Sequence, residues 1–182
     1  MKQDMVLRTA DHGDIDRLNI LIRRSGIELS RGFYTPEQAR VLVKYIFGVD
    51  TALIDDQTYY LVEYRDEIVA CGGWSKRATL YGGDQAKSGE DPLLDPATQP
   101  ARIRAFFVAP DWARRGLGMR LMEKCEKAAR DAGFSRMELG STLPGVPLYR
   151  AAGFEVIEEF SIVLPGDVRV PLMRMAKRLD AV

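Results

Sequence analysis

Residues 106–119 read FFVAPDWARRGLGM, from Phe106 to Met119. An apolar run typical of a strand ends near Val108, a short turn follows, and two glycines mark the start of a helix. The first backbone N–H groups of a helix have no intrahelical partner, and the macrodipole places partial positive charge there. Glycine lets a ligand approach that backbone closely. The segment therefore predicts an anion site, whose usual occupants are phosphates.

Two arginines strengthen this interpretation. Arg114 and Arg115 stand at the helix start, where a cation opposes the macrodipole, and the next carboxylate of the helix is Glu123. A bound diphosphate would make this arrangement favourable. The alternative is a pair of solvated loop arginines beside a glycine-rich helix start.

Two known phosphate-binding motifs, the Walker loop and the dinucleotide-binding fingerprint, can be compared with this segment. A Walker loop ends in Gly-Lys-Ser/Thr, which is absent here. A dinucleotide-binding fingerprint would use Gly116 and Gly118, with Glu138 near the end of the next strand as the ribose-binding acid. Against it, Leu121 stands at the third glycine position, and the chain has only one convincing strand–helix–strand unit. A dinucleotide-binding domain therefore stays as a weaker alternative.

The rest of the chain alternates strand and helix patterns, which indicates one α/β or α+β domain over residues 1–182 with a mixed sheet. Strands are predicted over residues 5–8, 59–64, 68–74, 102–108, 135–139, 154–164 and 168–177. Helices are predicted over residues 15–26, 36–47, 115–132 and 146–152. Thr35 to Gln38 form a capping box with proline at the first helical position. Residues 75–100, rich in glycine and proline, are expected to be a long flexible loop or lid.

Composition limits the class of function. The 182 residues contain 26 Lys and Arg and 26 Asp and Glu, a formal net charge of zero. A dedicated nucleic-acid-binding protein needs a basic excess, so we expect no nucleic-acid partner. No apolar run approaches the roughly 20 residues that cross a bilayer, and no apolar signal segment follows Met1. We therefore expect a soluble, cytoplasmic protein with no membrane contact.

The few metal-binding and redox-active residues are scattered. Cys71 and Cys125 form no CxxC pair and lie in apolar patterns, so we expect buried, reduced thiols. His12 is the single histidine. A multi-histidine metal site is therefore impossible, and we expect no metal.

Two motifs resemble those of the GNAT acetyltransferase superfamily. Residues 113–119, ARRGLGM, are similar to the family's acetyl-CoA pyrophosphate loop, Gln/Arg-x-x-Gly-x-Gly/Ala, with Ala113 at the Gln/Arg position. Residues 148–154, LYRAAGF, are similar to its Tyr-x-x-x-Gly-Phe. The resemblance implies a single GNAT-like domain with a mixed, largely antiparallel sheet flanked by helices. The strands at 102–108 and 135–139 should be its parallel neighbours.

The resemblance also implies a reaction: acetyl-CoA as co-substrate gives its acetyl group to an amine of a small molecule or protein, by direct attack in a ternary complex. The end of a strand would pair with the pantetheine arm, and backbone N–H groups would hold the diphosphate. Tyr149 would be catalytic, protonating the departing thiolate. The implied cofactor-binding residues are Phe106, Phe107, Val108, Arg114, Arg115, Gly116, Leu117, Gly118 and Met119. A non-catalytic acyl-CoA-binding or regulatory module on the same fold is the alternative, and a homodimer stays open.

The sequence leaves the general base and the acceptor open. Glu63, Glu138 and a chain of water molecules are the candidates for removing the proton of the amine. The acceptor should bind among the first two helices and the 75–100 loop. Candidate pocket aromatics are Trp74, Tyr81, Phe33 and Tyr34.

Overall fold

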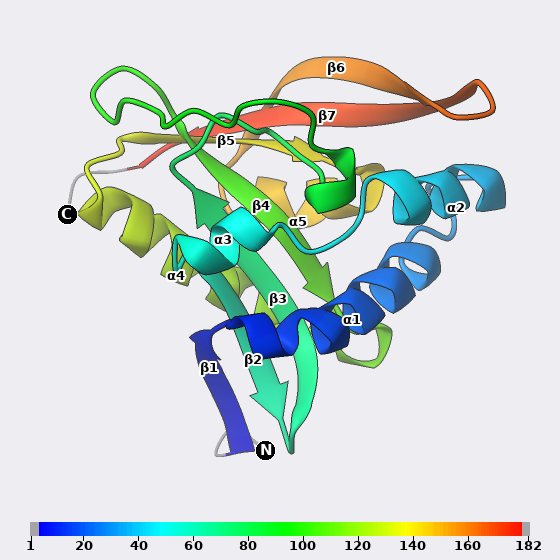
Figure 1. Ribbon diagram of the computed structural model, residues 1–182, viewed down its shortest axis with the longest axis horizontal. Coiled ribbons are helices and arrows are strands. Elements are labelled where there is room, and N and C mark those ends of the chain that lie inside the picture. Colours follow the sequence, from blue (N-terminus) through cyan, green and yellow to red (C-terminus); the bar gives the residue numbers. More distant parts are fainter. Residues whose placement is uncertain (1–3, 180–182) are drawn as a thin grey trace.

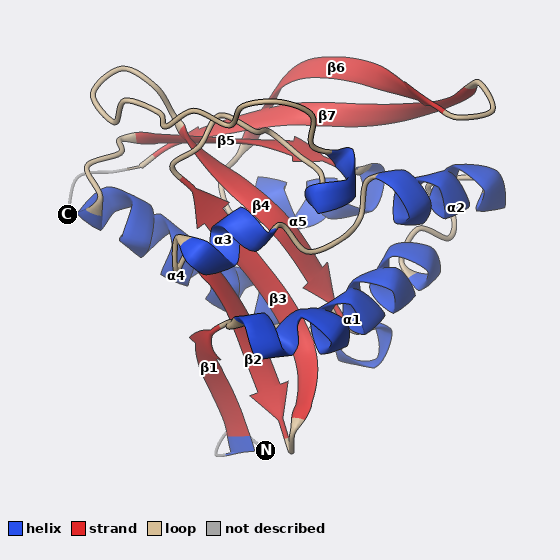
Figure 2. Cartoon of the chain, in the orientation of Figure 1, coloured by secondary structure: helices blue, strands red, loops and turns tan. Residues whose placement is uncertain are grey.

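A seven-stranded sheet forms the centre of the molecule, whose computed structural model describes residues 4–179. The strands lie in the order β1-β2-β3-β4-β5-β7-β6, and among these seven described strands only β4 and β5 are parallel neighbours (Figure 2). Their bounds are β1 Met5–Thr9, β2 Tyr59–Tyr64, β3 Glu67–Ser75, β4 Ala101–Val108, β5 Arg136–Ser141, β6 Glu155–Leu164 and β7 Val168–Arg178. The predicted mixed, largely antiparallel sheet with one parallel pair is confirmed.

Helices cover both faces of this sheet (Figure 1). On one side lie α1 Ile15–Glu28, α2 Pro36–Tyr45 and α3 Thr51–Asp55, and on the other α4 Leu117–Asp131 and α5 Val146–Ala151. Two larger apolar cores result, one between the sheet, α4 and α5, and one between the sheet, α1 and α3, and a smaller cluster lies between α2 and β7. Strand β4 contributes side chains to both cores, so it is the element around which the two halves are organised.

Local sequence explains the helix ends. The predicted capping box is present: Thr35 Oγ1 accepts from the Gln38 N–H at 3.1 Å, and Gln38 Oε1 accepts from the Thr35 N–H at 3.0 Å. Gly133 follows α4 with a φ of 91°, the left-handed conformation expected after a helix end. The short helix α3, which begins after the capping Asp50, was not predicted. Its five residues are too few to show a helical period.

The segment 76–100 connects β3 to β4 along the side of α2 and α3. It contains a short 3₁₀ turn, Asp84–Ala86, and a single bridge between Arg77 and Leu93. Backbone hydrogen bonds tie it to the chain after α2: the Gly83 N–H donates to Ile46 at 2.8 Å, and the Asp84 N–H to Val49 at 3.0 Å. Its flexibility stays a prediction, but its position is fixed by these contacts.

Within residues 4–179, none of the helices is both long and apolar enough to cross a membrane.

Candidate functional site

The outer half of β4 has a free edge. On one side β4 pairs with β3 as far as Val108, but it pairs with β5 only at Ala101 and Arg102. The Ala109 N–H donates to Val69 of β3 at 2.8 Å. Because backbone groups alternate between the two edges of a strand, the N–H and C=O of Val108 point towards the β5 side. This edge is therefore available to an extended ligand.

A bulge re-aims the side chains of β4 at this point. Between Cys71 and Gly73 of β3 lies one residue, whereas two residues separate their β4 partners Phe107 and Arg104. The extra residue adopts a left-handed conformation at Ala105, with a φ of 53°. Strain of this kind costs about 1–3 kcal/mol and is often kept at functional sites. Here the surroundings support it, because the buried Tyr59 hydroxyl lies 3.1 Å from the Ala105 carbonyl oxygen.

Consecutive strand residues point to opposite faces of the sheet, and the bulge decides which of the rings of Phe106 and Phe107 lies on which face. Phe107 packs into the core beside α1, and Phe106 into the core beside α4 and α5. Gly72 makes room for the second ring, because a Cβ atom there would lie 2.6 Å from Phe106 Cδ2. Phe106 thereby reaches Tyr149.

The start of α4 lacks internal capping. No side chain caps it, and no acidic residue lies in its first turn. Gly116 stands before it with a φ of 83°, and Arg114 has a φ of 61°. The helix begins at Leu117, so Arg114, Arg115 and Gly116 precede it and the 115 start predicted from the sequence was too early. The unpaired N–H groups of the first turn belong to Leu117, Gly118 and Met119.

The two glycines of the motif have different surroundings. A Cβ atom at Gly116 would meet nothing within 4 Å, whereas one at Gly118 would lie 2.8 Å from Leu148 Cδ2. Gly116 is thus required by its backbone conformation and faces open space. Gly118 allows α4 to pack closely on α5, the helix that carries Tyr149.

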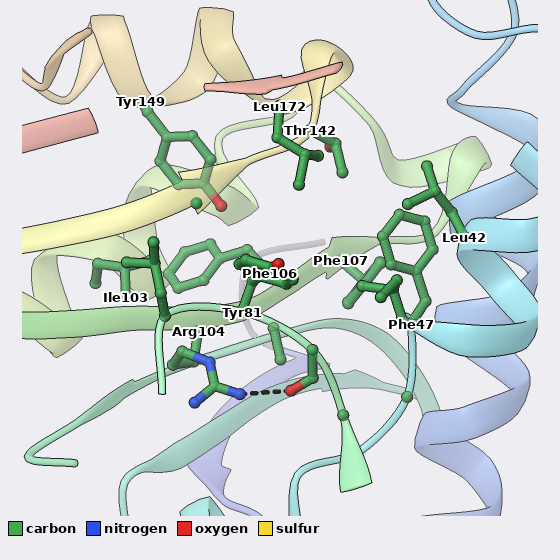
Figure 3. A pocket seen from close by; sticks show the side chains of 17 residues that line it. Leu42, Phe47, Tyr81, Ile103, Arg104, Phe106, Phe107, Thr142, Tyr149 and Leu172 are labelled. Atoms are coloured by element: carbon green, nitrogen blue, oxygen red, sulfur yellow. Dashed lines mark hydrogen bonds between the residues drawn. The ribbon is translucent and has the colours of Figure 1, made fainter. Parts of the chain in front are cut away.

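Tyr149 has its ring in the core and its hydroxyl at a cavity (Figure 3). Only 8% of the residue is exposed, and its ring contacts Phe106 and Phe154 at centroid distances of 6.2 and 6.1 Å. Burial raises the pKa of the Tyr149 phenol well above its usual value. The hydroxyl therefore keeps its proton at neutral pH and can donate a hydrogen bond.

The cavity beside Tyr149 has a volume of about 80 Å³. It lies where several segments that are distant in sequence meet (Figure 3). Its wall is formed by the end of α2, residues 80–83 of the loop, residues 103–107 of β4, the end of β5, Tyr149 and Leu172. Of the four candidate aromatics, only Tyr81 lines it. Trp74 is in the core, Tyr34 bonds to the backbone of Leu143 and Pro171, and Phe33 is 49% exposed at the surface.

A buried ion pair supports this wall, and sequence reasoning missed it. Arg104 of β4 is 2% exposed and donates to Asp50 Oδ2 at 2.9 Å. The same guanidinium donates to the carbonyl oxygens of Thr79 and Gly82. Lys87 Nζ lies 2.6 Å from Asp50 Oδ1. The only sequence signal was an arginine within an apolar strand pattern.

Neither carboxylate proposed as a base lines the cavity. Glu63 accepts hydrogen bonds from Arg8 and Arg17 at 2.9 and 3.1 Å, and those from Arg8 lower the pKa of its carboxyl group. Glu138 is bonded to Arg102 and Arg174 at 3.0 and 2.6 Å. Both carboxylates are already hydrogen-bonded to arginines, so the structure favours neither of them as a base at this site.

The remaining predicted residues lie apart from the cavity. Cys71 and Cys125 are buried free thiols, and burial raises the pKa of Cys71 to about 12. His12 is exposed at the surface, with Nε2 2.8 Å from Asp55 Oδ1. Between residues 4 and 179, no group of three or more His, Cys, Asp or Glu side chains is placed to hold a metal ion.

Comparison with known proteins gives a consistent result. The sequence matches the acetyltransferase (GNAT) family over residues 26–154. A GCN5-related N-acetyltransferase from Rhodopseudomonas palustris has a similar structure, with a TM-score of 0.67 and 16% identity, over 96% of this chain and 95% of that one. PaiA N-acetyltransferase from Thermoplasma acidophilum, in complex with coenzyme A, is similar with a TM-score of 0.64 and 14% identity, over 96% of this chain and 98% of that one. The YncA acetyltransferase from Salmonella typhimurium, with its cofactor acetyl-CoA, is similar with a TM-score of 0.62 and 16% identity, over 98% of this chain and 95% of that one. No protein of curated function matches the sequence.

Proposed function

Because this chain belongs to the GNAT acetyltransferase family, we propose that it uses acetyl-CoA to acetylate an amine. The observation that supports this most strongly is that α5 brings three features together: the uncapped start of α4, the free edge of β4 and the hydroxyl of Tyr149. Its Leu148 contacts the start of α4 at Gly118, and its Tyr149 contacts Phe106 on the strand with the free edge. A ligand with an extended arm and a diphosphate could engage all three.

Acetyl-CoA would be held mainly by backbone groups. Its pantetheine arm would add to the free edge of β4 at Phe106, Phe107 and Val108, as an extra strand does. Its diphosphate would accept hydrogen bonds from the loop and first turn of α4, residues 114–119, where no side chain competes for the N–H groups. Arg114 and Arg115 would add positive charge.

The transfer step needs only one acid. The neutral amine nitrogen attacks the thioester carbonyl carbon, forming a C–N bond as the carbonyl π electrons move to oxygen. When these electrons return, the C–S bond breaks and the sulfur leaves with the electron pair. The Tyr149 hydroxyl donates its proton to this sulfur, and solvent supplies the proton back. The surplus proton of the amine passes to water.

Tyr149→Phe tests the catalytic assignment. It keeps the ring between Phe106 and Phe154 but removes the proton, so kcat should fall about 10²–10⁴-fold. The affinity for acetyl-CoA, measured by calorimetry, should stay within about twofold. Tyr34→Phe is the matched control, because the Tyr34 hydroxyl serves structure: it donates to Pro171 O and accepts from Leu143 N. The free energy of unfolding of that variant should fall by about 1 kcal/mol, and its kcat should stay unchanged.

Two results would contradict the assignment. If Tyr149→Phe unfolds the protein, or weakens acetyl-CoA binding while the turnover of the bound complex stays unchanged, the tyrosine is structural. If the unaltered protein binds acetyl-CoA but releases no thiol with a broad panel of amines, the chain is a non-catalytic acyl-CoA-binding module.

A further inference from the structure

The wall of the cavity beside Tyr149 is formed mostly by apolar side chains. Its carbon-rich side chains come from three directions: Leu42 and Phe47 at the end of α2, Leu80 in the loop, and Phe106 and Leu172 in the sheet. Figure 3 shows Tyr149 on one side of the pocket and Leu42 and Phe47 on the other. Such a wall stabilises an uncharged carbon skeleton and disfavours an isolated charge.

The one charged side chain on this wall, among residues 4–179, is already neutralised. Arg104 donates to Asp50 and to the carbonyl oxygens of Thr79 and Gly82. Asp50 is 1% exposed and also binds Lys87 and the N–H of Ala52. Its carboxylate therefore has no free face for the ammonium group of a ligand.

The wall also lacks a base for the acceptor. Its titratable or charged side chains within the described chain are Arg104 from β4, Tyr81 from the loop and Tyr149 from α5. None of these is a carboxylate or an imidazole. Among these side chains, an ammonium group that entered would therefore meet no carboxylate as a counterion and no carboxylate or imidazole as a base.

We propose that the acceptor is a small, apolar primary amine that carries no second charge and enters the cavity as the neutral free base. This inference rests on the proposed function and names its substrate class. The volume of about 80 Å³ suits a short skeleton, because one water-sized sphere needs roughly 10–15 Å³. Deprotonation then takes place in water, before binding.

A matched pair of substrates tests the charge requirement. Butylamine and 1,4-diaminobutane have the same chain, but the second keeps an ammonium group at its far end. We expect kcat/KM to favour butylamine by about 10²–10³-fold, as for a buried charge left without a partner. Equal or better use of the diamine would overturn the inference. It would leave the proposed acetyltransferase activity standing.

Binding of the two amines to the CoA complex, measured by calorimetry, separates the two claims. If neither amine is acetylated but butylamine still binds more tightly, the cavity assignment holds and the proposed function fails. If the diamine binds as tightly as butylamine, the cavity assignment fails, whatever the activity.

The pH profile tests entry as the free base. An alkylamine with a pKa near that of lysine, about 10.4, gains tenfold in its neutral fraction per pH unit below that value. With butylamine, log kcat/KM should therefore rise with a slope of about one between pH 7 and 9. A plateau below pH 8 would reveal a protein base and overturn this part of the inference.

Thr142→Asp should change the preference. Thr142 lines the cavity and precedes a short turn of 3₁₀ helix, a position where aspartate is well tolerated. A carboxylate there gives a second ammonium group its counterion, so the preference for butylamine should shrink to about tenfold or less. Thr142→Asn, with the same shape and no charge, should keep the original preference. If both variants give the same ratio, charge does not set the specificity.

Discussion

The side of β4 that faces α4 and α5 takes its proposed binding groups from one short segment, 106–119, together with Tyr149. On the side that faces α2 and the 76–100 loop, four separated stretches form most of the cavity wall, which also includes Phe106 and Tyr149 of the first site. A buried ion pair between residues 54 positions apart supports this wall. The first site depends on backbone conformation at a few glycines. The second depends on side chains that reach across the fold. The two sides should therefore respond differently to substitution.

Arg104→Met should have the largest effect on stability. It leaves the Asp50 carboxylate buried with only Lys87 as a cationic partner, which should cost about 3 kcal/mol of unfolding free energy in urea. Because the guanidinium also holds residues 79–82, the KM of the acceptor should rise about tenfold. The affinity for acetyl-CoA should change less than twofold.

Two further variants control this experiment. Arg23→Met, on the exposed face of α1, should leave stability and KM unchanged. Adding Asp50→Asn to Arg104→Met should recover part of the loss, because the unpaired charge is removed. If Arg104→Met weakens acetyl-CoA binding as much as acceptor binding, the two sides are not separate.

Gly116→Ala should act on the acetyl-CoA side with a smaller effect on stability. A side chain at a φ of 83° costs about 1–2 kcal/mol, and the added methyl group hinders approach of the diphosphate. We expect acetyl-CoA to bind about tenfold more weakly in calorimetry, with the acceptor KM unchanged.

Gly118→Ala is the matched control for this substitution. The family pattern accepts alanine at this position, and the nearest atom to the new methyl group is the movable end of Leu148. Acetyl-CoA affinity should therefore stay within about threefold. Equal losses at both glycines would show that close approach of the ligand, and not backbone conformation, sets the requirement.

Lys87→Met should have the smallest effect and tests whether the 76–100 loop is flexible. The substitution removes ion pairs to Asp50 and Asp91, at 2.6 and 3.1 Å, but leaves Arg104 in place. Stability should fall by about 1 kcal/mol, and amide hydrogen exchange in residues 79–91 should become about fivefold faster. Lys127→Met, at an exposed pair on α4, should change neither. If exchange in this loop is already unprotected in the unaltered protein, the loop is flexible despite these contacts.

Much of the fold was predictable because its signals are local. The capping box at Thr35, the glycine after α4 and the turn between β6 and β7 each lie within a few residues, and they fixed most element types. The α4 boundary was two residues off because Arg115 favours a helix in isolation, whereas the left-handed Gly116 delays its start. The helix α3 was missed because it is too short to show a period.

The amino-acid sequence by itself determined the strand–glycine–helix segment, which we propose binds the diphosphate, and the position of Tyr149 in its motif, because both are encoded in contiguous residues. Only the tertiary structure decided which charges are free. It paired Glu63 and Glu138 with arginines, buried Arg104 against Asp50, and left the cavity wall, within the described residues, without a carboxylate or an imidazole. The physical reason is that a charge is free or neutralised according to its neighbours in space, and these neighbours lie tens of residues away along the chain.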